Sequence, residues 1–130
     1  VAPVGALCRV ARDGSGALAG AVRVWPVRIG AAGHPALLLG PVAVHPAHQG
    51  EGVGAALIRE VLEIARARGW ARVLLVGDAP YYGRFGFTRA AAATIDFPRP
   101  VNPERCLACA LVAGAFDGVS GTLRPWRDRD

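Results

Sequence analysis

The sequence predicts an α/β domain of mixed α+β type: a central mixed sheet with an antiparallel N-terminal hairpin, one long crossover helix and a C-terminal hairpin. Three observations lead to this class. Apolar runs of strand length, separated by turn signals, occur in both halves of the chain. One amphipathic stretch of helical length, residues 53–68, lies between two of these runs. A length of 130 residues is typical of one domain, so residues 1–130 are expected to form a single unit.

The first half of the chain contains three predicted strands. Residues 6–10 and Leu18–Ile29 flank a turn at residues 13–16, which favours an antiparallel hairpin. Residues 36–44 are apolar without alternation, as expected for a strand buried on both faces. Pro41 lies inside this third run. Because proline cannot donate to a sheet ladder, we expect a bulge or a separation from one neighbouring strand there.

The second half begins with the predicted helix, residues 53–68, which Gly69 should end. Arg72–Val76 is the next predicted strand, and a right-handed crossover through the helix makes it parallel to the third strand. A short helical turn is expected at residues 81–84. Residues 107–112 and 119–123, on either side of a turn at 115–118, are expected to form the closing hairpin.

Composition narrows the class of function. The chain is 52% hydrophobic and 19% charged, which is typical of a soluble globular protein, and its longest apolar runs are too short to cross a membrane. The formal charge is +5, and the chain contains arginine but no lysine. This usage is typical of proteins from GC-rich genomes, and we expect a bacterial source. The arginines are scattered and form no continuous run. We therefore expect no nucleic-acid partner and no membrane partner.

The cysteines indicate a reducing compartment. Three cysteines cannot all pair, which favours a cytoplasmic location. Cys106 and Cys109 form a C-x-x-C sequence that is compatible with metal or redox chemistry. However, no second paired spacing completes a zinc site, and the surrounding residues are typical of a strand. We interpret the pair as buried small hydrophobic residues and predict no metal site.

Residues 44–55, Val-His-Pro-Ala-His-Gln-Gly-Glu-Gly-Val-Gly-Ala, join the third strand to the helix. The helix starts without a Ser, Thr, Asp or Asn cap, so its first N–H groups lack a side-chain partner. Glycines at 50, 52 and 54 leave the backbone bare. Free N–H groups at the positive end of a helix dipole form a site for a phosphate or pyrophosphate. The alternative is a flexible glycine-rich turn.

The phosphate ligand is not fixed by this loop alone. Gly50, Gly52 and Ala55 match the spacing of the dinucleotide fingerprint, and Asp78 ends the next strand, where a ribose-binding acid would lie. In that fold the first glycine directly follows the strand, whereas residues 45–49 intervene here. Only one strand–helix–strand unit is present, and no Gly-Lys-Ser/Thr sequence supports a Walker loop.

Two motifs together resemble those of the GCN5-related N-acetyltransferases. Gln49-x-x-Gly52-x-Gly54 opens a helix after a strand, and residues 78–87, Asp-Ala-Pro-Tyr-Tyr-Gly-Arg-Phe-Gly-Phe, are similar to the family's Tyr-x-x-x-Gly-Phe segment. The resemblance implies that acetyl-CoA is the co-substrate and that an amine-bearing acceptor receives the acetyl group. It implies an N-acetyltransferase, with a non-catalytic CoA-binding module as the alternative.

The resemblance also implies residue roles. Val42, Ala43 and Val44 would bind the pantetheine of the cofactor. The pyrophosphate would be held by the loop residues Gln49, Gly50, Glu51, Gly52, Val53, Gly54 and Ala55. Asp78, which stands where many members have asparagine, would also contact the cofactor. Tyr82 would protonate the departing thiolate, which suits a phenol with a pKa near 10. The alternative is that Tyr82 only packs with Tyr81, Phe85 and Phe87.

Two features stay open at this point. No general base is assigned, although His45, His48 and Glu51 flank the loop. Family members normally begin with a strand and two helices that this sequence does not show, so we expect the 1–130 domain to be N-terminally incomplete. Apolar surface exposed in consequence would favour association, and a homodimer is possible. The acceptor itself is not indicated by the sequence.

Overall fold

The computed structural model describes residues 7–98 and 101–126, which form a seven-stranded mixed sheet in the order β5-β7-β2-β3-β4-β6, with β1 paired to β2. The strands are β1 (Arg9–Arg12), β2 (Leu18–Ile29), β3 (His34–Val44), β4 (Arg72–Val76), β5 (Ile95–Asp96), β6 (Cys106–Ala110) and β7 (Gly121–Pro125). The α-helices are α1 (Val53–Ala67) and α2 (Ala79–Tyr82). The 3₁₀ turns are η1 (Pro46–His48), η2 (Gly83–Phe85), η3 (Ala90–Ala92) and η4 (Pro103–Arg105).

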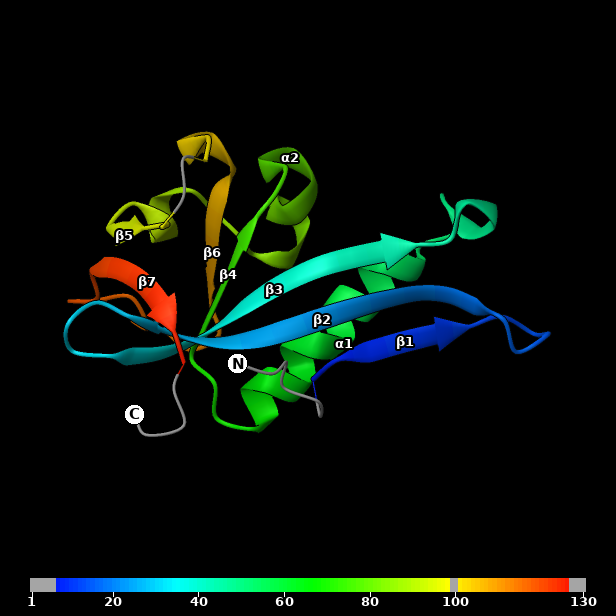
Figure 1. Ribbon diagram of the computed structural model, residues 1–130, viewed down its shortest axis with the longest axis horizontal. Helices are drawn as coiled ribbons and strands as arrows, with labels where there is room; N and C mark the ends of the chain where they lie inside the picture. Colours follow the sequence, from blue (N-terminus) through cyan, green and yellow to red (C-terminus); the bar gives the residue numbers. More distant parts are fainter. Residues whose placement is uncertain (1–6, 99–100, 127–130) are drawn as a thin grey trace.

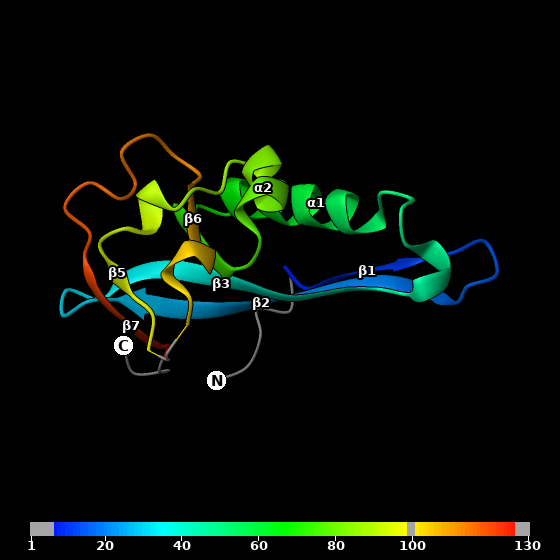
Figure 2. The ribbon, with the colours of Figure 1, turned by 90° about the horizontal axis from the view of Figure 1, so that it is seen from above.

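The predicted hairpin and crossover are both confirmed. β1 pairs antiparallel with β2, and β2 has the predicted bounds. The predicted first strand starts at residue 6, outside the described residues, and its paired part begins at Arg9. β3 runs antiparallel to β2 and parallel to β4, and α1 connects β3 to β4. Figure 2 shows α1 and α2 on the same side of β2 and β3.

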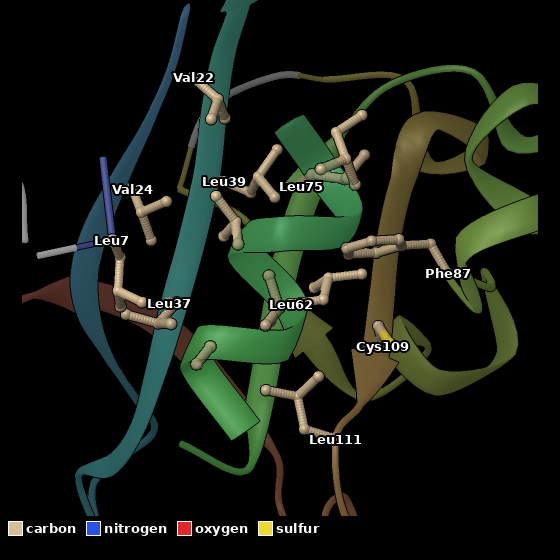
Figure 3. Close-up of a cluster of buried hydrophobic side chains, with 14 of the residues drawn as sticks. Leu7, Val22, Val24, Leu37, Leu39, Leu62, Leu75, Phe87, Cys109 and Leu111 are labelled. Atoms are coloured by element: carbon tan, nitrogen blue, oxygen red, sulfur yellow. The ribbon is translucent and has the colours of Figure 1, made fainter. Parts of the chain in front are cut away.

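α1 forms because its apolar residues recur at helical spacing and its two ends carry glycines. Its buried positions share one face: Gly54, Leu57, Ile58, Val61, Leu62 and Ala65. Gly69, with φ of 89°, follows the last turn, as expected for a helix end. This face packs on the sheet against Leu39, Leu75 and Phe87, which are at most 5% exposed. Figure 3 shows these side chains converging around the helix.

β3 separates from β4 after its first half, as the proline predicted. The parallel pairing between them covers only Leu37 with Val73 and Leu38 with Leu74. The register between β2 and β3 also shifts between Val22 and Val24, opposite the Gly40–Pro41 peptide, which is cis. Figure 1 shows the two strands diverging toward their carboxyl ends. The β4-facing edge of residues 40–44 is therefore free of strand pairing.

The predicted closing hairpin is wrong. β6 pairs with β4, whereas β7 pairs with β2 and β5, so the last two strands lie at different places in the sheet. Burial explains why β6 and β7 lie apart. β7 pairs with the second half of β2 and places Leu123 in a core cluster with Val27 and Ile29. Two glycines permit the approach: a Cβ on Gly121 would stand 2.7 Å from the Cα of Gly30.

The C-x-x-C pair lies in β6, as the apolar pattern predicted. Cys106 and Cys109 are 8% and 5% exposed, respectively. Burial raises the pKa of both thiols, which keeps them protonated at neutral pH. Within the described residues, no helix has the length and apolar character needed to cross a membrane.

Candidate functional site

The loop from β3 to α1 is shaped by its own local hydrogen bonds. His45 caps η1, because its Nδ1 accepts from the Ala47 N–H at 3.0 Å. Gly50 and Gly52 then adopt φ of 83° and 82°, a left-handed conformation that suits glycine. A Cβ on either glycine would meet no other atom within 4 Å, so both residues border open space. The loop therefore turns sharply and leaves its backbone uncovered.

The amino end of α1 presents free donors. The Ala56 N–H makes the first helical hydrogen bond, to the Gly52 carbonyl at 3.0 Å, and Gly52 has no side chain to cap the residues before it. Among the described residues, no backbone acceptor is found for the N–H groups of five loop residues: Gly50, Gly52, Val53, Gly54 and Ala55. Val53, Gly54 and Ala55 form the first turn of α1, at the positive end of its dipole, which favours an anion.

Two of the predicted backbone donors are occupied. The Gln49 N–H bonds to the Pro46 carbonyl and the Glu51 N–H bonds to the His48 carbonyl, both at 3.4 Å. These long hydrogen bonds close the 3₁₀ turns that precede the helix. Of the seven residues from 49 to 55 that the resemblance places around the pyrophosphate, five therefore have an N–H without a backbone acceptor among the described residues. The Glu51 carboxylate also points elsewhere, to the His48 ring.

A cavity of about 350 Å³ lies over the free amides. Its lining residues come from the loop, the start of α1, the end of β3 and the α2–η2 turn: Val44, His48, Gln49, Gly50, Gly52, Val53, Gly54, Ala55, Tyr81 and Arg84. Seven of these were predicted as binding residues from the sequence. Arg84 lines the cavity from η2. A cation and a row of N–H donors thus meet in one hollow, as an anion requires.

His48 also lines the cavity, and its ring lies between two carboxylates. Its Nδ1 lies 2.7 Å from Oε1 of Glu51, and its Nε2 lies 3.1 Å from Oδ2 of Asp13. A carboxylate only accepts hydrogen bonds, so two such contacts require both ring nitrogens to donate, as in the imidazolium. The bond to Glu51, followed by that to Asp13, raises the pKa of His48. These contacts favour the imidazolium form of His48 and tie the ring to the β1–β2 turn, and the two carboxylates offset its charge.

The free edge of β3 presents alternate backbone groups. The His45 N–H bonds to the Ala19 carbonyl of β2 at 2.7 Å. Backbone direction alternates along a strand, so Ala43 also faces β2, while Val42 and Val44 face the gap toward β4. The N–H and carbonyl of Ala43 point toward β2, so they are not available to a ligand in the gap. Val42 and Val44 keep an N–H and a carbonyl each for a ligand lying in the gap.

Tyr82 belongs to an aromatic cluster beside this gap. Its ring centroid lies 5.0 Å from that of Tyr81 and 6.1 Å from that of Phe87. A Cβ on Gly77, directly after β4, would stand 2.5 Å from Cε2 of Tyr82, so a glycine there lets the ring lie against the strand end. Burial raises the pKa of the Tyr82 phenol. The Tyr82 ring therefore packs in the cluster, while its hydroxyl stays protonated at neutral pH.

Asp78 is a predicted binding residue that does not line the cavity. It is exposed at the start of α2, and its carbonyl accepts from the Tyr82 N–H at 2.9 Å. Its side chain makes no capping hydrogen bond, and Asp78 does not line the cavity. Within the described residues, no group of three or more His, Cys, Asp or Glu could hold a metal ion.

Sequence reasoning missed Tyr81 and Arg84. The Tyr81 hydroxyl would lie 3.7 Å from a Cβ on Gly54, and Arg84 donates from Nε to the Tyr81 carbonyl at 3.0 Å. The guanidinium also lies over the Tyr81 ring, 4.5 Å from its centroid. Both residues are in the predicted helical turn, and an arginine there was the available signal. Only the packing of α2 against the amino end of α1 shows that they face the loop.

Comparison with known proteins agrees with these motifs. Residues 5–89 match the family model described as "Acetyltransferase (GNAT) domain". The chain is 42% identical over 76 residues to the uncharacterized N-acetyltransferase YjhQ of Escherichia coli K12, covering 58% of this chain and 41% of that protein. It is 30% identical over 114 residues to the uncharacterized N-acetyltransferase YhbS of the same strain, covering 88% of this chain and 68% of that protein.

Solved structures show the same fold. The crystal structure of YhbS from Escherichia coli in complex with CoA superposes with a TM-score of 0.83 at 29% identity, over 92% of this chain and 66% of that one. A family acetyltransferase from Brucella melitensis in complex with acetyl-CoA gives 0.71 at 33% identity, over 95% and 68%. The chain thus spans between two fifths and about two thirds of the length of these proteins.

Proposed function

The chain belongs to the acetyltransferase (GNAT) family, and from this premise we propose that it transfers the acetyl group of acetyl-CoA to a primary amine. The observation that carries the proposal is the cavity at the amino end of α1, which is lined by Arg84 and by five residues whose N–H groups have no backbone acceptor among the described residues. Structures of two relatives, from Escherichia coli and Brucella melitensis, contain CoA and acetyl-CoA, respectively.

The residues around the cavity fit the parts of acetyl-CoA. The diphosphate would accept hydrogen bonds from the N–H groups of Gly50 and residues 52–55, with Arg84 supplying positive charge. The pantetheine arm would lie in the gap between β3 and β4, bonded to the backbone of Val42 and Val44. A Cβ on Gly54 would approach Val44 to 3.3 Å and Val42 to 3.9 Å, so a larger side chain would narrow the path between diphosphate and pantetheine.

The catalytic role falls to Tyr82. Acetyl-CoA, when bound, supplies an acetyl group activated as a thioester. The amine nitrogen would form a bond with the acetyl carbon, and as the carbon–sulfur bond breaks the Tyr82 hydroxyl would donate its proton to the sulfur. The proton that the amine loses would pass to water, and water would return a proton to Tyr82. A half-buried phenol with a raised pKa keeps its proton at neutral pH, as this role requires. The same gap would admit the amine from the face of the sheet opposite α1, because α1 and its core cluster close the other face.

One experiment distinguishes an acetyltransferase from the two alternatives for this loop, a non-catalytic CoA-binding module and a dinucleotide site. Acetyl-CoA is titrated into the protein by calorimetry, and thiol release is then measured with a small amine, a peptide N-terminus and a lysine side chain as acceptors. Saturable binding with amine-dependent thiol release supports the proposal. Binding without release for any acceptor indicates a CoA-binding module. Thermal stabilisation by NADH in place of acetyl-CoA would indicate a dinucleotide site.

A further inference from the structure

A groove of about 380 Å³ lies beside the cavity, between α1 and η2. It is lined by three arginines, one glutamate and two apolar residues: Arg59, Arg66, Arg84, Glu63, Leu62 and Phe85. The charged groups are exposed, whereas Leu62 is buried. Three guanidinium groups facing one carboxylate leave an excess of positive charge, and the apolar residues form the floor. Such a groove suits a ligand with an anionic group next to a flat, weakly polar one.

The groove continues the cavity at the helix start. Arg84 lines both hollows, so one side chain stands between the free amides and the groove. A ligand whose diphosphate occupies the cavity can extend along the surface of α1 into the groove. A molecule with phosphate groups at two separated places can place one in each hollow.

The arginines are held in place by protein contacts. The Arg59 guanidinium lies over the Phe85 ring, 5.1 Å from its centroid. Arg66 donates from Nε to the Leu111 carbonyl at 3.1 Å, as Arg84 does to the Tyr81 carbonyl. In Arg66 and Arg84 these bonds use Nε, which leaves the terminal nitrogens to face a ligand. Restricted guanidinium groups lose less entropy when they bind a phosphate.

We propose that this groove binds the 3′-phosphate of the adenosine part of acetyl-CoA and that Arg59 is the residue that recognises it. The inference rests on the proposed function, which supplies the diphosphate as the anchor. A 3′-phosphate carries close to two negative charges and accepts several hydrogen bonds, so Arg59 and Arg84 together are the donors it needs. Dephospho-CoA has the same diphosphate, adenine and pantetheine without this group.

The experiment compares CoA with dephospho-CoA on the same protein. By calorimetry, we expect the wild type to bind CoA more tightly by roughly tenfold, the effect of one charge-assisted contact at a surface. Arg59→Ala should bring the two affinities close together by weakening CoA alone. Arg68→Ala is the matched control: an exposed arginine at the end of α1 that lines neither hollow. It should retain the wild-type preference.

The outcomes separate the two proposals. Equal affinities of the wild type for CoA and dephospho-CoA would overturn the 3′-phosphate site while leaving acetyl-CoA binding intact. A loss of affinity for both ligands in Arg59→Ala would assign Arg59 to another part of the ligand and would also overturn it. Failure of the wild type to bind either ligand would reject the proposed function itself. A far-ultraviolet circular dichroism spectrum of each variant verifies that it is folded.

Discussion

Replacing Gly52 by alanine tests the need for a bare backbone at the helix start. Gly52 has φ of 82°, and a Cβ there would meet no protein atom within 4 Å. The substitution therefore has two separate effects. It forces a side chain into a left-handed conformation, and it places a methyl group beside the free N–H groups.

Gly69 at the other end of α1 is a matched control. Its φ is 89°, and a Cβ there also meets nothing within 4 Å. Both substitutions should lower the free energy of unfolding by about 1–2 kcal/mol, the cost of the left-handed conformation for a residue with a Cβ. Urea denaturation of both variants measures this shared effect. The two variants should differ only in what they do to the ligand.

Acetyl-CoA binding should separate the pair. In Gly52→Ala, loss of one hydrogen bond to a charged phosphate costs about 1.5–3 kcal/mol, which is on the order of 10- to 100-fold in Kd. Gly69→Ala should bind as the wild type does, because the residue lies at the far end of the helix. Calorimetric titration of the folded variants gives both constants. If Gly52→Ala binds acetyl-CoA as tightly as Gly69→Ala, the bare backbone is not needed and the reasoning fails.

Four further predictions concern two titrating residues, the catalytic residue and one core residue. The pKa of His48 is raised in the folded state, so its contribution to stability is complete below the unfolded value near 6.5 and is lost as the pH rises through the folded value; His48→Gln should remove this step from denaturation curves recorded against pH. The pKa of Asp13 is lowered to about 2 by its bonds to Ser15 and His48, so its contribution is present above about 3.8 and is lost as the pH falls through about 2; Asp13→Asn should remove that acid step. Tyr82→Phe should lower kcat by roughly 100-fold, as expected for loss of a general acid, with little change in the Kd of acetyl-CoA; an unchanged kcat in thiol-release assays would limit Tyr82 to packing. Phe87→Ala should lower the free energy of unfolding by about 3–5 kcal/mol, because the ring is 1% exposed between α1 and β6; a loss below 1 kcal/mol by urea denaturation would contradict its place in the core.

Local patterns predicted the elements that depend on local forces. β2 and β4 have their predicted bounds, and α1 ends one residue before the predicted end. In each case the hydrophobic period and the flanking glycines act within a few residues. The bulge at Pro41 was predictable for the same reason, because a proline removes a donor wherever it stands.

Long-range pairing was not predictable in the same way. β7 pairs with β2, more than ninety residues earlier in the chain, because both contribute to one apolar cluster. A pair of adjacent apolar runs around a turn suggests a hairpin whether or not one forms. β1 pairs with the first part of β2, up to Val22, and leaves the edge of its last residues unpaired. β7 pairs with this remaining part, Val27 to Ile29, and only the assembled sheet shows that it is available.

The candidate site was predictable in its backbone and less so in its side chains. The glycine spacing identified the free amides, but the assignment of Ala43 required the direction of its backbone in the sheet. Gln49 and Glu51 use their amides in turns that the spacing does not show. Arg84 was missed because its position depends on how α2 packs against α1. Side chains that meet only through tertiary packing leave no periodic pattern.

Amide chemical shifts at the start of α1 test the central claim most directly. In a ¹⁵N-labelled sample titrated with acetyl-CoA, the N–H resonances of Gly50, Gly52, Val53, Gly54 and Ala55 should move most and saturate together, since a phosphate oxygen becomes their acceptor. Those of Gln49 and Glu51, already bonded to Pro46 and His48, should move less. Saturable binding that leaves these five resonances in place would show that acetyl-CoA is held elsewhere.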